Sequence, residues 1–222
     1  MQQNKLHQID LLRGLPKPKR NITARKAAKN PDVIRIAKEY GEAYFDGSRD
    51  YGYGGYRYDG RWLPVAKDMV AYFNLKPGDT FLDIGCAKGF LLQDLKTVCP
   101  GLEVFGLDIS NYALQQADDT VKRHVVLGTA NQLPFKTGAF TAAVAINTLH
   151  NLPKPDLIKS LQEIQRVCGG HAFIQVDSYL TPEEKAIFES WVLTAEFHDY
   201  PEKWIELFEM AGYTGGYNWT IV

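Results

Sequence analysis

Two aspartates and a glycine-rich turn are the residues of this chain best suited to hold a ligand. Asp83 ends a short apolar run, and a turn from Gly85 to Gly89 follows it. A glycine turn between a strand and a helix lets a ligand approach the main chain and leaves backbone N–H groups at the helix start. Asp108 ends the next apolar run, 25 residues after Asp83. Its carboxylate is placed to accept hydrogen bonds from both hydroxyls of a ribose.

The spacing of the glycines excludes two common phosphate-binding loops. Counted from Gly85, the dinucleotide fingerprint G-x-G-x-x-G needs glycine where this chain has Ala87 and Phe90. A phosphate P-loop needs Lys and then Ser or Thr after Gly89, and this chain lacks them. A carboxylate just before the glycines repels a pyrophosphate and pairs with an ammonium. The pattern therefore favours a cofactor that carries an amino group.

A parallel sheet is needed to bring these side chains together. Almost continuous apolar runs predict strands at residues 81–84, 103–108, 125–127, 142–146, 171–179 and 215–222. Helical patterns stand between them, which predicts an α/β sandwich of three layers with helices on both faces of a mostly parallel sheet. Ligands of such sheets bind beyond the carboxyl ends of the strands. The polar or flexible residues at those ends are Asp83, Asp108, Thr129, Ala130, Asn147, His150 and Asp177.

With these motifs the chain resembles the class I S-adenosylmethionine-dependent methyltransferases, over residues 75–177. The resemblance rests on FLDIGCAKG, VFGLDIS, LGTANQLPF, INTLHNL and EIQRVCGGHAFIQVD, in that order. It implies a Rossmann-like fold, S-adenosylmethionine as cofactor and methyl transfer as the activity. The sheet of this family has seven strands, the last two forming a hairpin. Because the nine residues 214–222 suffice for one strand, we expect six clear strands, unless residues 192–197 supply another.

The resemblance also implies roles for single residues. Asp83 and the backbone from Gly85 to Gly89, with Cys86 and Ala87, would hold the methionine end of the cofactor. Asp108 would hold the ribose, Ile109 would pack on adenine, Thr129 and Ala130 would lie in the adenine loop, and Asn147 would border the sulfonium. Two positions depart from the family pattern. Thr129 stands where an acid is usual, and Ala87 stands at a glycine position that we expect a methyl group to fill without a positive φ.

Methyl transfer to an O–H or N–H group also requires the removal of a proton. His150 is the first candidate base, since an imidazole with a pKa near 6.5 suits proton removal at neutral pH. The alternative is that His150 shapes the pocket or caps the turn between Pro153 and Pro155. Asp177 is a candidate to orient His150 or to bind the acceptor, although strand-end aspartates also cap turns.

A tyrosine- and glycine-rich stretch, residues 44–62, is expected to contact the acceptor as a lid. Rigid aromatic rings on a flexible backbone suit a pocket wall, and a surface loop fixed by its tyrosines is the alternative. Candidate acceptor contacts are Tyr53, Tyr56, Tyr58 and Arg61, together with His198 from a later segment. The turn from Asn147 to His150 lacks the Asn/Asp-Pro-Pro-Tyr/Phe signature of family members that methylate nucleic-acid amino groups or glutamine. A small-molecule or sugar-like acceptor, methylated on O or N, is therefore favoured over a macromolecule.

The N-terminal part has a separate composition. Residues 1–60 are expected to comprise a basic arm, a helix and the lid, and residues 61–222 the cofactor-binding domain. Between Arg13 and Lys29 there are seven basic residues and no acidic one. We interpret the arm as a solvated extension that packs loosely, and recruitment of RNA is the alternative. A further alternative is a regulatory domain of this fold with degenerate catalysis.

Composition limits the remaining possibilities. The chain has 222 residues with a formal net charge of −1, which fits one globular domain and gives no general argument for binding nucleic acid. No apolar run approaches the length of a membrane span, and the first residues lack the apolar core of a signal peptide. Three cysteines without CxxC spacing predict reduced thiols and no metal site, in a cytoplasmic protein of open oligomeric state.

Overall fold

A single parallel sheet forms the centre of the computed structural model, which describes residues 5–16 and 21–221. Its seven strands follow the order β1-β7-β6-β5-β2-β3-β4, and all of the pairs are parallel among the described residues. The strands are β1 (His7–Gln8), β2 (Thr80–Ile84), β3 (Glu103–Asp108), β4 (Val125–Leu127), β5 (Ala142–Ile146), β6 (Ala172–Ser178) and β7 (Gly216–Ile221).

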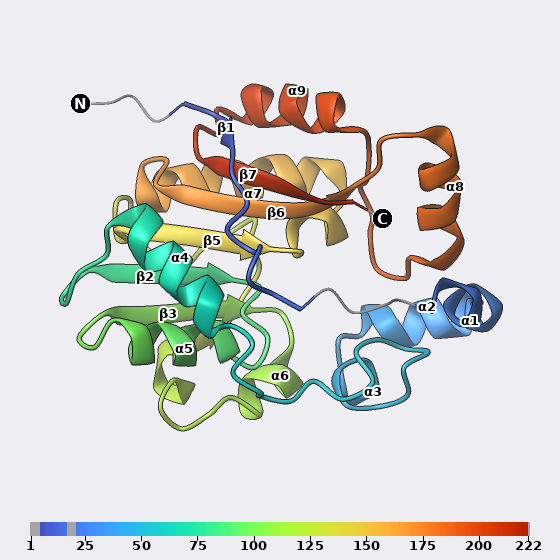
Figure 1. Cartoon of the computed structure of the whole chain (residues 1–222), viewed down its shortest axis with the longest axis horizontal. Helices are drawn as coiled ribbons and strands as arrows, with labels where there is room; N and C mark the ends of the chain where they lie inside the picture. Colours follow the sequence, from blue (N-terminus) through green and yellow to red (C-terminus); the bar gives the residue numbers. More distant parts are fainter. Residues whose placement is uncertain (1–4, 17–20, 222) are drawn as a thin grey trace.

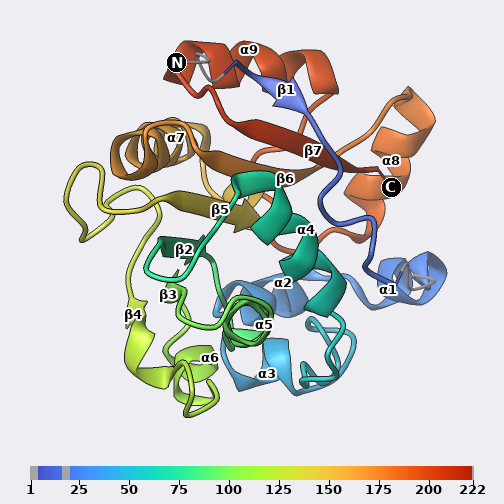
Figure 2. The same cartoon turned by 60° about the vertical axis from the view of Figure 1, so that its left-hand side comes forward.

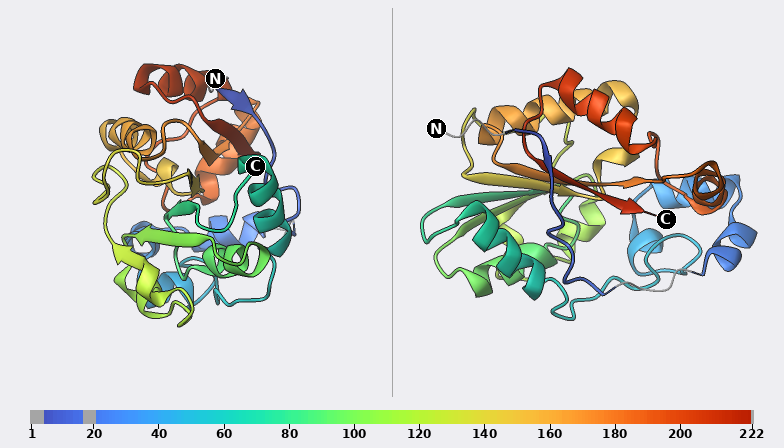
Figure 3. Two further views of the ribbon diagram at one scale, coloured as in Figure 1. Left: turned by 90° about the vertical axis from the view of Figure 1, so that its left-hand side faces the viewer. Right: turned by 45° about the horizontal axis from the view of Figure 1, so that its top comes forward.

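Helices cover both faces of this sheet, as predicted (Figures 1 and 2). One face carries α4 (Leu63–Phe73) and α5 (Phe90–Val98), while the other carries α7 (Lys154–Cys168) and α9 (Pro201–Ala211). The short α6 (Asn111–Gln115) lies beside β3 and β4. Four more helices gather at the carboxyl edge of the sheet (Figure 3): α1 (Ile22–Ala28), α2 (Pro31–Lys38), α3 (Glu42–Phe45) and α8 (Pro182–Trp191).

Burial on both faces explains why the central strands are apolar throughout. All residues of β6 are buried. Phe81 and Phe173 pack with Met69 of α4, whereas Leu82 and Ile174 pack on the opposite side with helices α7 and α9. Because side chains of a strand alternate between the two faces, each strand needs apolar residues at successive positions. The Rossmann-like three-layer fold follows from this pattern.

The seventh strand comes from the N-terminus, which the sequence analysis did not foresee. The six expected strands are confirmed, but residues 192–197 form no strand in the described structure. Instead β1 pairs with β7, with His7 opposite Gly216, and the N–H of Ile9 donates to the carbonyl of Tyr217 at 2.9 Å. Strand β7 runs parallel to β6, so the described residues do not form the terminal hairpin of the family. A two-residue strand has too little hydrophobic pattern to be recognised in a sequence.

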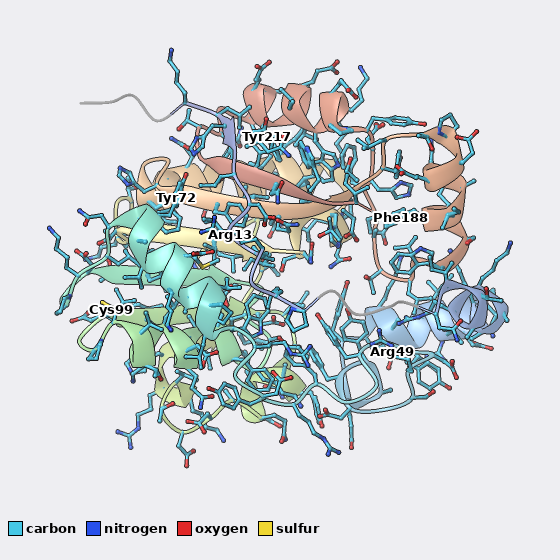
Figure 4. The ribbon with its side chains drawn as sticks, in the orientation of Figure 1. Arg13, Arg49, Tyr72, Cys99, Phe188 and Tyr217 are labelled. Atoms are coloured by element: carbon cyan, nitrogen blue, oxygen red, sulfur yellow. The ribbon has the colours of Figure 1, made fainter. Side chains whose placement is uncertain are left out.

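Beyond β1, the N-terminal segment (residues 9–16) crosses the face of the sheet that carries α4. Leu11 is only 3% exposed, and Leu12 and Leu15 pack against the same cluster. The guanidinium of Arg13 donates two hydrogen bonds, of 2.9 and 3.0 Å, to the carboxylate of Asp68 on α4 (Arg13 is labelled in Figure 4). The expectation of a loosely packed arm is therefore wrong for this segment; residues 17–20 lie outside the described residues.

If the N-terminal segment belongs to the core, Leu11→Ala should destabilise the protein by about 2–4 kcal/mol, since it removes a buried side chain and leaves a cavity. Urea unfolding followed by circular dichroism measures this change. Leu180→Ala, at a side chain that is 59% exposed, is the matched control and should change the free energy of unfolding little. Equal effects of the two substitutions would contradict the assignment.

Candidate active site

A cavity of about 740 Å³ lies at the carboxyl edge of the sheet, next to the glycine turn. Of the residues predicted from the sequence to bind the cofactor, five line it: Asp83, Gly85, Cys86, Ala87 and Asn147. Tyr53, Tyr56 and Arg61 of the lid line it as well. The remaining walls come from the N-terminal segment, from Trp62 and from the strands β5, β6 and β7.

Three residues of the glycine turn, Gly85, Ala87 and Gly89, have a left-handed backbone conformation. Gly85 has a φ of 81°, and a β-carbon at this position would overlap the side chain of Thr148. Ala87 has a φ of 50°. The expectation that alanine fits here without a positive φ is therefore wrong. Since a left-handed conformation costs a non-glycine residue about 1–2 kcal/mol, the turn stores strain beside the cavity.

Most of the N–H groups of the turn are already engaged within the protein. Gly85 and Cys86 both donate to the carbonyl of Leu107, at 2.7 and 3.1 Å. Ala87 donates to Oδ2 of Asp108 at 2.7 Å, and Gly89 donates to the carbonyl of Cys86 at 2.8 Å. The turn thus lets a ligand approach closely but offers few donors to an anion, which agrees with the exclusion of a pyrophosphate.

Asp108 is oriented by two backbone N–H groups. Besides Ala87, the N–H of Ser110 donates to its Oδ1 at 2.7 Å. Burial raises the pKa of Asp108, and these hydrogen bonds oppose the rise. Each carboxylate oxygen keeps one lone pair for a further donor, such as a ribose hydroxyl. Next to it, Ile109 exposes 57% of its surface, as expected for an apolar side chain that an adenine ring would cover.

The loop that follows β4 lies beside Asp108. The N–H of Gly128 donates to the main-chain carbonyl of Asp108 at 3.0 Å. Thr129 is exposed, whereas Ala130 is buried in the core. Neither of them lines the cavity, nor do Asp108 and Ile109. The predicted methionine side of the site is therefore the cavity around Asp83, whereas the predicted adenosine side lies outside it, where the buried Asp108 adjoins the exposed residues Ile109 and Thr129.

Asp83 presents a buried carboxyl group to the cavity. It is 5% exposed, and among residues 5–16 and 21–221 no group donates a hydrogen bond to its side chain. Burial, and secondarily the charge of Asp108, raises the pKa of Asp83 to about 7. A buried carboxylate without a donor is costly unless a cation or a donor joins it. The geometry therefore fits an ammonium group bound against Asp83.

Cys86 is a packing residue of this cavity. Its thiol is buried, and burial raises its pKa well above the usual value. A thiol that resists ionisation is a poor nucleophile. The small size of Cys86, rather than its reactivity, therefore suits the turn.

A buried ion pair fastens the lid to the glycine turn. Nζ of Lys88 lies 2.6 Å from Oδ2 of Asp46, which directly follows α3, and also donates to the carbonyl of Tyr56 at 2.9 Å. The Asp46 carboxylate further accepts hydrogen bonds from the Tyr112 hydroxyl at 2.7 Å and from the Tyr56 N–H at 3.1 Å. Burial opposes ionisation of Asp46, but these partners together lower its pKa.

The aromatic residues of the lid divide into two groups. Tyr53 and Tyr56 line the cavity with their rings 4.5 Å apart, and Tyr56 stacks on Phe90 at the start of α5 at 4.8 Å. Tyr58, in contrast, donates to Asp94 on α5 at 2.5 Å and does not line the cavity. The prediction of a structured aromatic wall thus fits the positions of two of these three tyrosines.

His150 and Asp177 contact each other at the ends of β5 and β6. Nδ1 of His150 accepts the N–H of Asp177 at 3.2 Å, and Nε2 lies 3.5 Å from Oδ2 of Asp177. A ring nitrogen that accepts an N–H group carries no proton, so the neutral ring is protonated at Nε2, toward the carboxylate. Both nitrogens are therefore engaged within the protein, and neither residue lines the cavity.

His198 does not line the cavity and lies next to α8. It is a predicted acceptor contact, but it is half-buried away from the cavity, with its ring 5.0 Å from that of Phe188. The hydroxyl of Tyr179 lies 3.2 Å from its Nδ1. Burial lowers the pKa of His198, which favours the neutral ring. These contacts indicate that His198 has a packing role.

Sequence reasoning missed the part of the cavity formed by the N-terminus and the last strands. Leu12 and Arg13 line it, as do Gln175 of β6 and Trp219 and Thr220 of β7. Gln175 interrupts an apolar strand, a polar signal that the sequence did contain. The N-terminal residues gave no comparable signal, since only the tertiary structure brings them to the cavity.

Two further classes of site were searched for in the described part of the chain. Residues 5–16 and 21–221 contain no group of three or more His, Cys, Asp or Glu side chains that could hold a metal ion. None of the helices in the described ranges is long and apolar enough to span a bilayer.

The raised pKa of Asp83 predicts how stability depends on pH. In the unfolded chain this carboxyl ionises near pH 4, whereas in the folded protein it holds its proton to about pH 7. The folded state therefore binds more protons in this interval, so its stability falls as the pH rises from about 4 to 7. Asp83→Asn should remove this fall and be more stable than wild type at pH 8 by about 2–4 kcal/mol.

Urea unfolding of both proteins at pH 5, 6.5 and 8 measures this effect. Asp119→Asn, at an exposed residue, is the control. Parallel pH profiles of wild type and Asp83→Asn would show that Asp83 is ionised in the folded protein and would contradict the prediction.

The ion pair of the lid gives a second prediction. Lys88→Met leaves Asp46 with a partly buried and unpaired charge, and should destabilise the protein by about 2 kcal/mol. Lys67→Met, at an exposed position of α4, should change stability little. Limited proteolysis provides a local readout, because residues 44–62 should be cleaved faster in Lys88→Met only. Cleavage of this segment at the wild-type rate would show that the pair does not hold the lid.

A family model with the description "Methyltransferase domain" matches residues 82–174. This range runs from Leu82 in β2 to Ile174 in β6. These residues carry Asp83, the glycine turn, Asp108 and His150.

Curated proteins similar to this chain carry methyltransferase or synthase names. The chain is 27% identical over 175 residues to the (+)-O-methylkolavelool synthase of Herpetosiphon aurantiacus, covering 66% of this chain and 61% of that protein. It is 31% identical over 148 residues to the 2-phytyl-1,4-naphtoquinone methyltransferase of Trichormus variabilis, covering 60% and 64% of the two chains. The chain therefore spans less than two thirds of the length of these relatives.

Solved structures share the fold. The chain that was crystallised with the Haloferax volcanii Trm112 methyltransferase activator matches with a TM-score of 0.56 and 24% identity, covering 66% of each chain. The YcgJ protein of Bacillus subtilis matches with a TM-score of 0.54 and 17% identity, covering 69% of this chain and 68% of that one. The family model over residues 82–174 and the order of the motifs on the sheet identify a methyltransferase domain with the Rossmann-like fold, and these two structures share that fold.

Proposed function

We propose that this protein transfers a methyl group from S-adenosylmethionine to an oxygen or nitrogen atom of a small molecule. The observation that carries the proposal is the pair of carboxyl groups at the ends of β2 and β3. Asp83 lines the cavity and accepts no hydrogen bond from the described residues, and the buried Asp108 lies next to the exposed side chain of Ile109, with each of its oxygens held by a backbone N–H group.

The residues present suit this cofactor. Asp83 would hold its ammonium group, Asp108 its ribose hydroxyls, and Ile109 its adenine ring. Glycine is required at position 85, since a β-carbon there would overlap the side chain of Thr148. When bound, the cofactor supplies a methyl group on a sulfonium, which an acceptor lone pair takes while the sulfur keeps the electrons of the broken bond. The enzyme then has to align the acceptor and to exclude water.

Proton removal is the second task of the protein. Because both nitrogens of His150 are engaged, we assign the base to Asp177, the one carboxylate of the pair, and a positioning role to His150. Asp177 stands two residues after the cavity-lining Gln175 on β6, and side chains two residues apart share a face, so its carboxylate lies on the side of the sheet that the cavity occupies.

A small apolar acceptor agrees with the cavity walls and with the names of the relatives. Leu12, Tyr56 and Trp62 line the cavity together with Asp83. The relatives are named for a methylated terpenoid alcohol and for a naphthoquinone, both of them small molecules. An acceptor of this kind would bury its apolar surface in the cavity.

Recruitment of RNA by the basic arm has less support. Arg13 pairs with Asp68, the guanidinium of Arg25 donates to the carbonyl of Gly52, and Lys29 donates to the carbonyl of Glu189. Basic side chains that bind within the protein are not free to contact phosphates.

Binding of S-adenosylhomocysteine tests the proposal. Isothermal titration of the wild-type protein should give micromolar affinity, and Asp83→Asn or Asp108→Ala should weaken it by at least tenfold, since each removes a charged hydrogen-bond partner. Asp119→Asn should bind as the wild type does.

Transfer of a labelled methyl group to a panel of hydroxylated terpenoids, quinols and aromatic amines then tests activity. Cofactor binding without transfer to any compound would favour the regulatory alternative. Absence of binding would refute the proposal altogether.

A further inference from the structure

The cavity continues from Asp83 across the sheet to its far edge. Gln175 of β6 lies on the same face as Phe173, which packs toward α4, because side chains two residues apart share a face. Asn218 is the register partner of Gln175, and Thr220 is that of Asp177. Gln175, Asn218 and Thr220 line the cavity, and the N-terminal segment lines it through Leu12, Arg13 and Leu15. We call this part the β7 chamber.

A chain of hydrogen bonds crosses the ends of three strands in the β7 chamber. Nε2 of Gln175 donates to Oγ1 of Thr220 at 3.0 Å, and this hydroxyl donates to Oδ1 of Asn147 at 3.0 Å. Gln175 is 5% exposed, and its Oε1 is buried without a hydrogen-bond partner among the described residues. A buried acceptor that stays unpaired costs about 1–3 kcal/mol, so this oxygen calls for an O–H or N–H donor from a ligand.

The charges around the chamber disfavour an anionic ligand, since Asp10 and Asp83 also line the cavity. Arg13 binds both carboxylate oxygens of Asp68, at 2.9 and 3.0 Å. Arg61 binds Asp59 through hydrogen bonds of 2.6 and 2.9 Å. Each guanidinium that lines the cavity is thus neutralised by its own carboxylate. A ligand with a phosphate or carboxylate group would have to compete with these pairs.

The walls of the chamber favour a flat, apolar ligand. Trp62 and Ile146 line it together with Leu12. Ile146 and Trp62 pack with the cluster on the α4 face of the sheet, the face that Gln175 shares. An indole beside aliphatic side chains matches an aromatic ring.

We propose that the β7 chamber binds the methyl acceptor, an uncharged aromatic alcohol with a hydroxyl group that donates a hydrogen bond to Oε1 of Gln175. This inference rests on the proposed function and specifies its substrate class. It makes Gln175 and Leu12 the residues that determine specificity. Because Leu12 belongs to the N-terminal segment, the pairing of β1 with β7 also shapes the acceptor site.

Binding of 2-naphthol to the protein saturated with S-adenosylhomocysteine tests this assignment. Quenching of tryptophan fluorescence should report binding, and Gln175→Leu should weaken it about tenfold, since the hydroxyl loses its acceptor. The same substitution should leave the affinity for 2-methoxynaphthalene unchanged, because that probe has no hydroxyl to donate. Leu12→Trp should fill the chamber and weaken the binding of both probes.

Gln116→Leu, at an exposed residue that follows α6, is the matched control and should bind both probes as the wild type does. Affinity for S-adenosylhomocysteine should stay the same in all variants, which shows that they fold. Wild-type affinity for 2-naphthol in Gln175→Leu would overturn the proposal and would mean that water satisfies this glutamine. Absence of 2-naphthol binding by the wild type at about 1 mM would also overturn it, while the proposed function would fail only if S-adenosylhomocysteine did not bind.

Discussion

The enclosure of the site depends on the ion pair between Lys88 and Asp46. Lys88 belongs to the glycine turn and Asp46 to the start of the lid, and their charged atoms lie 2.6 Å apart with the lysine side chain only 7% exposed. Burying two charges is costly unless further hydrogen bonds support them. Tyr112 and two backbone groups of Tyr56 provide that support. The lid is therefore fixed at the turn, and Tyr53 and Tyr56 become walls of the cavity.

Two residues of the same region lower the stability of the protein. Ala87 adopts a positive φ, and Asp83 keeps a buried carboxyl group whose pKa is raised to about 7. Neither feature benefits the free protein. Both make sense for a site whose ligand brings an ammonium group and has to approach the main chain closely, since binding would then relieve the cost of the buried carboxylate.

The N-terminal segment connects the fold with the site. By pairing with β7 and packing Leu11 into the core, it extends the sheet at the edge next to β7. It also covers the space above Gln175 and Thr220, which an open sheet edge would leave exposed to water. The sequence pattern predicts no role in cofactor binding for the N-terminal segment. Its residues nevertheless shape the β7 chamber.

The sequence alone determined the parts that depend on local pattern. Six strands, the glycine turn and the positions of Asp83 and Asp108 follow from apolar runs and glycine spacing, because these report burial and backbone conformation directly. The tertiary structure decided what depends on contacts between distant segments. It placed Leu12 opposite Gln175, engaged both nitrogens of His150 with Asp177, and moved Tyr58 and His198 away from the cavity. Such contacts are set by packing and register, which leave no periodic signal along the chain.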